Sequence, residues 1–97
     1  DGPAQQEILR LAKTQAENAA GRPLFESLDF RSLLPPMGGM SGAEISEVLR
    51  RALEQKVYAA GEGRDAGLVT TQDLLHQIDA YRRIREVVEK IRYGQYL

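Results

Sequence analysis

The chain has no cysteine and a single histidine, His76. Disulfide bonds and thiolate metal sites are therefore excluded, and one histidine is too few for a histidine-based metal cluster. No apolar run approaches the roughly 18 residues of a membrane span, and the N-terminus lacks the basic and apolar regions of a signal peptide. We expect no metal site and no membrane segment, and we expect the protein to be cytoplasmic.

The net charge is also small, because the chain has 13 basic and 14 acidic residues, which give a formal net charge of −1. Such a balance provides no overall field to attract a phosphate backbone, so we expect no nucleic-acid partner. The segment from Arg82 to Arg92 is locally basic, with Glu86 and Glu89 interleaved. A small nucleic-acid binder built on these arginines is the weakest of the interpretations considered, and a solvated helix face is the simplest.

Ninety-seven residues allow one domain, residues 1–97, with a single modest core. The chain lacks the phosphate-binding loop G-x-x-x-x-G-K-[ST], the nucleophile motif G-x-S-x-G and the zinc motif H-E-x-x-H. We therefore expect no catalytic residue in this chain. It begins with Asp1 and Gly2 and not with Met, which suggests a piece of a longer polypeptide.

The spacing of apolar residues predicts an all-α fold, a small four-helix bundle with a short extended segment before the last helix. The expected helices run from Pro3 to Ala20, from an N-cap at Asp29 to the proline pair at 35–36, from Ser41 to about residue 60, and onward from Thr70 or Thr71. The glycine-rich segment 61–67 reads as a surface loop. The expected core consists of Ile45, Val48, Leu49, Ala52, Leu53, Leu74, Ile78, Tyr81 and Ile84.

The heptapeptide at 39–45 is the most informative part of the chain. Ser41 and Glu44 form an S-x-x-E capping box, in which each side chain accepts a hydrogen bond from a backbone N–H at the helix start. Gly42 and Ala43 then fall in the first helical turn, where free N–H groups and the positive end of the helix dipole face outward. Their side chains are too small to keep a purine or ribose from the backbone.

Together these features resemble the C-terminal helical lid subdomain of AAA+ ATPases, in the AAA group itself. The resemblance rests on a Pro-initiated helix that reaches Ile8 and Leu9, a Leu-rich segment at 28–34, the Gly-x-Ser-Gly-Ala-acidic-aliphatic signature at 39–45, and the helix opening at 69–74. It covers nearly the whole chain. Met40 stands where the family usually has an aromatic residue, and Gln5 stands where it often has an arginine.

The resemblance implies that Gly42 and Ala43 line the adenosine side of an ATP or ADP site. Magnesium and the catalytic residues for ATP hydrolysis would lie in the nucleotide-binding core of the parent ATPase. The implied partners are that core domain, the neighbouring subunits of a homo-hexameric protein-remodelling machine, and a protein substrate. The lid alone is not expected to bind nucleotide tightly.

A second interpretation stays open. The chain could be a free-standing helical adaptor that binds a partner protein through its last helix and the tail from Tyr93 to Leu97.

Overall fold

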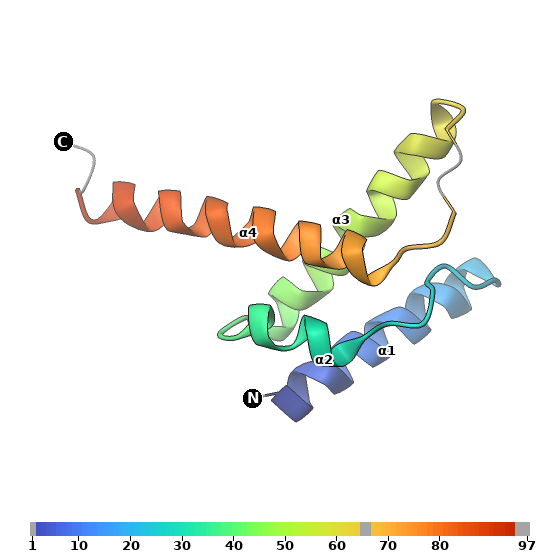
Figure 1. The fold of residues 1–97 in the computed structure, drawn as a ribbon, viewed down its shortest axis with the longest axis horizontal. Helices are drawn as coiled ribbons and strands as arrows, with labels where there is room; N and C mark the ends of the chain where they lie inside the picture. Colours follow the sequence, from blue (N-terminus) through green and yellow to red (C-terminus); the bar gives the residue numbers. More distant parts are fainter. Residues whose placement is uncertain (1, 65–66, 95–97) are drawn as a thin grey trace.

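A computed structural model describes residues 2–64 and 67–94 of the chain (Figure 1). Its elements are α1 (Gly2–Ala20), α2 (Phe30–Leu33), the 3-10 helix η1 (Pro35–Met37), α3 (Gly42–Gly61) and α4 (Thr71–Arg92). The predicted all-α class is confirmed, with three long helices and the single turn of α2 in the described part. Residues 65–66 of the expected loop and 95–97 of the expected tail lie outside the described residues.

Local hydrogen bonds explain where the helices begin. The Ser41 N–H donates to Glu44 Oε1 at 2.8 Å, and the Glu44 N–H donates to Ser41 Oγ at 3.2 Å, so the predicted capping box is present. A second box opens α4, where the Thr70 N–H donates to Asp73 Oδ2 at 2.8 Å and the Asp73 N–H returns a bond to Thr70 Oγ1 at 3.1 Å. Asp29 caps α2 as predicted. These side chains satisfy N–H groups that a helix start otherwise leaves without partners.

The short helix capped by Asp29 ends before the proline pair, as predicted, but the pair then begins a further helical turn. α2 ends at Leu33, and Pro35 and Pro36 instead form the first residues of η1. Proline is tolerated there because its missing N–H would have no partner in the first turn, and its fixed φ suits helical geometry.

One buried cluster joins all the elements. Most of the predicted core is buried or half-buried within it, but Ile84 is 55% exposed and the prediction that it belongs to the core was wrong. Helical spacing identifies the apolar face of a helix, but it does not show how far along the helix its neighbours cover that face. Other core residues come from loops and short elements: Phe25, Leu33, Met37, Met40 and Val69.

The predicted extended segment before the last helix is present as an isolated parallel bridge between Phe25 and Val69. The Val69 N–H donates to the Leu24 carbonyl at 2.9 Å, and the Glu26 N–H donates to the Val69 carbonyl at 2.9 Å. Glu17 on α1 accepts bonds from the N–H groups of residues 24 and 25. The loop after α1 is thereby fixed to both α1 and the entrance of α4.

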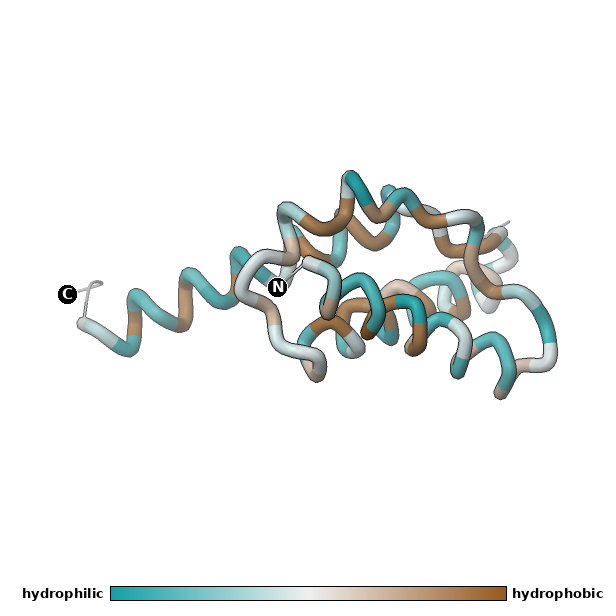
Figure 2. Tube along the Cα trace, turned by 90° about the horizontal axis from the view of Figure 1, so that it is seen from below, coloured by the Kyte–Doolittle hydropathy of each residue, from teal (hydrophilic) through white to brown (hydrophobic). Residues whose placement is uncertain are grey.

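α4 crosses α3 and then runs on past α2 and the start of α3, so that its C-terminal half projects from the body (Figure 1). Near the crossing, Lys56 on α3 forms an ion pair with Asp73 on α4 at 3.0 Å. Apolar positions gather where α1, α3 and the first half of α4 face one another, whereas those of the projecting half have no neighbouring helix (Figure 2). None of the helices in the described ranges has the length and apolarity needed to cross a membrane.

Candidate functional site

The start of α3 is held by a tight turn and an anchoring side chain. Gly39 has a φ of +81°, a left-handed conformation that favours glycine. Gln5 on α1 is buried, and its Nε2 donates hydrogen bonds to the carbonyls of Met37 at 2.8 Å and Met40 at 3.2 Å. The segment that delivers the chain into α3 is therefore fixed to α1.

The two predicted site residues, Gly42 and Ala43, have different surroundings. A Cβ at Gly42 would lie 3.3 Å from Ile8 Cδ1, so the missing side chain lets α1 pack closely against α3. Ala43 is exposed, and Gly42 is half-buried. Ala43 thus presents the accessible surface of the first turn, while Gly42 also has a packing role that the sequence did not reveal.

The polar groups at this helix start suit an uncharged ligand group better than an anion. Within the described residues, the N–H groups of Gly42 and Ala43 make no hydrogen bond, as expected in a first helical turn. The bond from the Ser41 N–H holds the pKa of Glu44 below its ordinary value, and the positive charge of Arg85 on α4 lowers it further. The ionised Glu44 beside these N–H groups would repel a phosphate, whereas a purine or a ribose hydroxyl could approach them.

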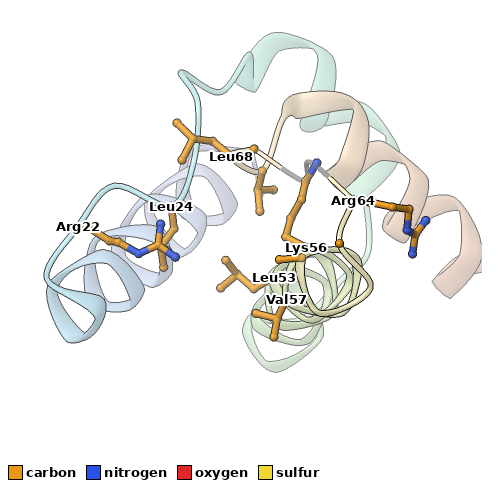
Figure 3. Close-up of a pocket in the computed structure, with 11 residues that line it drawn as sticks. Arg22, Leu24, Leu53, Lys56, Val57, Arg64 and Leu68 are labelled. Atoms are coloured by element: carbon orange, nitrogen blue, oxygen red, sulfur yellow. The ribbon is translucent and has the colours of Figure 1, made fainter.

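A separate cleft of about 740 Å³ opens near the other end of α3 (Figure 3). Leu24, Leu53 and Leu68 line it with apolar surface. Lys56 also borders the cleft, but it is paired with Asp73, and Arg64 points away from the central space (Figure 3). These residues come from separate segments that the fold brings together, so no local sequence signal could have identified the cleft.

No metal centre accompanies either place in the described structure. Across residues 2–64 and 67–94, no three His, Asp or Glu side chains lie close enough together to hold a metal ion. His76 is exposed on α4, and Ser41 is engaged in the capping box. The hydroxyl of Ser41 therefore caps the helix, with the Glu44 carboxylate as its neighbour.

Comparison with known proteins identifies no relative. No protein-family model matches the chain, and neither a curated protein nor a solved structure is significantly similar to it.

Proposed function

We propose that the chain is the helical lid of an AAA+ ATPase, which covers the adenosine side of a bound ATP or ADP and senses which nucleotide is present. The observation that carries the proposal is the start of α3. There, the Ser41–Glu44 capping box presents the free N–H groups of Gly42 and Ala43 beside an accessible first turn. The order of the helices and the sequence signature at 39–45 support the same assignment.

The packing around this helix start suits a rigid reporter of nucleotide state. Ile8 on α1 lies against the space where a Gly42 side chain would stand, Gln5 fixes the preceding turn to α1, and the charge of Arg85 on α4 acts on Glu44. A change in contacts at Ala43 would therefore displace α1, α3 and α4 together. Because packed helices move as rigid bodies, the lid would rotate as a unit and transmit the change to a neighbouring subunit.

The remaining parts of the proposed machine belong to other segments or chains. ATP with magnesium would be held by the core domain of the parent enzyme, which would also carry the catalytic residues. The proposed partners are this core, the adjacent subunits of a homo-hexamer and a protein substrate, in the cytoplasm. The described residues themselves would supply positioning and no chemistry.

The first test is to sequence the reading frame upstream of Asp1. An in-frame phosphate-binding loop ahead of this segment is the expected result. A start codon immediately before Asp1, with no such loop, would contradict the lid assignment.

The second test measures the affinity of the parent enzyme for ADP after Ala43→Leu. The larger side chain should obstruct the adenosine and weaken binding by about tenfold or more, equivalent to about 1.4 kcal/mol. Ala80→Leu, at an exposed position of α4, is the matched control and should leave the affinity unchanged. Normal affinity in the Ala43→Leu enzyme would show that the proposed contact is wrong.

One observation favours the second candidate function, a helical adaptor. Several large apolar side chains on α4 are exposed in the described structure, namely Ile84, Val87, Val88, Ile91 and, just after the helix, Tyr93. An adaptor would use such a surface to bind a partner protein. The upstream reading frame distinguishes this candidate from the lid as well.

A further inference from the structure

The projecting half of α4 carries an exposed apolar surface, which we call the α4 stripe and define as Ile84, Val87, Val88 and Ile91. Their exposed fractions are 55%, 46%, 55% and 64%. Isolated exposed apolar residues are common on protein surfaces, but four on one helix face form a continuous patch. Tyr81 packs against the core and residues 82–92 are exposed, so the stripe begins where the core ends, on the half of α4 that projects from the body (Figure 1).

The spacing of the stripe fits a second helix. Tyr81, Ile84, Val88 and Ile91 follow one another at intervals of three, four and three residues, which is the spacing of the seam in a coiled coil. Isoleucine and valine are β-branched and have few rotamers in a helix, so they lose little side-chain freedom when a partner docks. A helix laid along this face would place its own apolar side chains between these residues.

The charges around the stripe indicate what kind of helix would fit. At about 100° per residue, Arg85 and Arg92 lie along one side of the stripe, and Arg83 and Lys90 lie along the other. By the same geometry Glu86 and Glu89 lie on the far face of α4, together with Arg82. The apolar surface is therefore flanked by positive charge on both sides.

Two of these cations already have partners on α4 itself. Arg83 pairs with Asp79 at 3.0 Å, and Arg85 pairs with Glu89 at 3.5 Å. Both pairs are exposed, and exposed pairs of this kind contribute little to stability. A carboxylate on an approaching helix could therefore interact with either arginine at little cost.

We propose that the α4 stripe is a docking surface for an amphipathic helix of another protein whose apolar face is flanked by Asp or Glu. A second copy of this chain fits less well, because its own stripe would bring arginines and lysines against arginines and lysines. An anionic membrane fits less well too, because helices that lie on membranes present a wide apolar face with aromatic residues and a basic polar face. Here the stripe is purely aliphatic, and the far face is mixed in charge, with two glutamates beside Arg82.

The inference specifies the partner chemistry for the adaptor interpretation, and it does not rest on nucleotide binding. A lid could use the same surface. The experiment below involves no nucleotide, so its failure and the failure of the lid proposal can be recognised separately.

The test uses the 97-residue chain and two fluorescein-labelled synthetic helices of about 21 residues, or three heptads. Both peptides carry Leu at the seam positions, and they differ only in having Glu or Lys at the flanking positions. Fluorescence anisotropy measures the affinity of the chain for each. We expect the Glu peptide to bind about tenfold or more tightly than the Lys peptide, and to bind less tightly as salt is added.

Paired variants locate the binding surface. Val88→Ser combined with Ile91→Ser should weaken binding of the Glu peptide about tenfold or more. The control is Val57→Ser, which removes a 72% exposed apolar side chain from α3 and should have no effect. Arg85→Glu combined with Arg92→Glu leaves the stripe itself intact, and it should reduce the preference for the Glu peptide.

Several results would overturn the proposal. These are equal binding of the two peptides, no binding of either, or the same loss of affinity in the Val57→Ser control. Sedimentation showing a dimer that the Val88→Ser and Ile91→Ser changes disrupt would identify a second copy as the occupant. Binding to phosphatidylserine vesicles without binding to the Glu peptide would identify a membrane surface instead.

Discussion

Replacing Gln5 by Met tests the link between α1 and the start of α3. The thioether side chain has nearly the volume of glutamine but no N–H group, so the change removes two hydrogen bonds without opening a cavity. The Met37 carbonyl keeps a bond from the Met40 N–H at 3.0 Å, whereas the Met40 carbonyl loses its partner among the described residues. At about 0.5–1.5 kcal/mol for each of the two bonds, we expect a loss of about 1–3 kcal/mol.

The assay is urea unfolding followed by circular dichroism, with Gln6→Met as the matched control. Gln6 is the next residue on α1 and is exposed, so its replacement should change the free energy of unfolding by less than about 0.5 kcal/mol. For a domain of this size, the Gln5→Met loss should also lower Tm by about 5 °C or more. If the free energies of unfolding of the two variants agree within about 0.5 kcal/mol, the Gln5 amide does not stabilise the approach to α3.

Three further predictions concern the core and the start of α3. Leu33→Ala should lower the free energy of unfolding by about 2–5 kcal/mol in urea titrations, because Leu33 is fully buried; a loss well under 1 kcal/mol would contradict that placement. Glu44→Gln should reduce the fall in urea midpoint between about pH 6 and pH 3. A carboxylate whose pKa is lowered by folding stabilises the protein above its ordinary pKa of 4.5, and this stabilisation is lost as the pH falls through the folded-state pKa. An unchanged pH dependence of the urea midpoint would argue against the capping role. Gly42→Leu should lower the free energy of unfolding by about 1–3 kcal/mol more than Ala43→Leu, because the new side chain crowds Ile8. Calorimetry should show that adding Ile8→Ala restores part of this stability, and a double variant with no gain in stability would refute the close approach of the two residues.

Local signals in the sequence predicted the helices well. Capping boxes depend on residues three positions apart, so the box of Ser41 with Glu44 was predicted from the sequence, and Thr70 was one of the two expected N-caps of α4. Apolar spacing likewise predicted the buried faces of α3 and of the first half of α4. It failed at Ile84, because the stripe on α4 continues beyond the last helix that could cover it.

The candidate site was predicted in part for the same reason. Ser41 to Glu44 form one local motif, so their positions at the start of α3 followed from the sequence. The close approach of Ile8 to Gly42 did not, because these residues lie on different helices, and neither did the bonds from Gln5 to the loop before α3. A glycine looks the same in a sequence whether it makes room for a ligand or for another helix.

By itself, the sequence determined the all-α class, the helix starts and the absence of cysteine chemistry, because these depend on composition and on neighbours within one or two helical turns. Only the tertiary structure decided which apolar residues are covered and which remain exposed. It buried Leu33 and Val69, which lie in short or irregular segments, and left Ile84, Val88 and Ile91 uncovered on a regular helix. Burial depends on where distant segments end in space, and hydrophobic spacing along one helix carries no information about that.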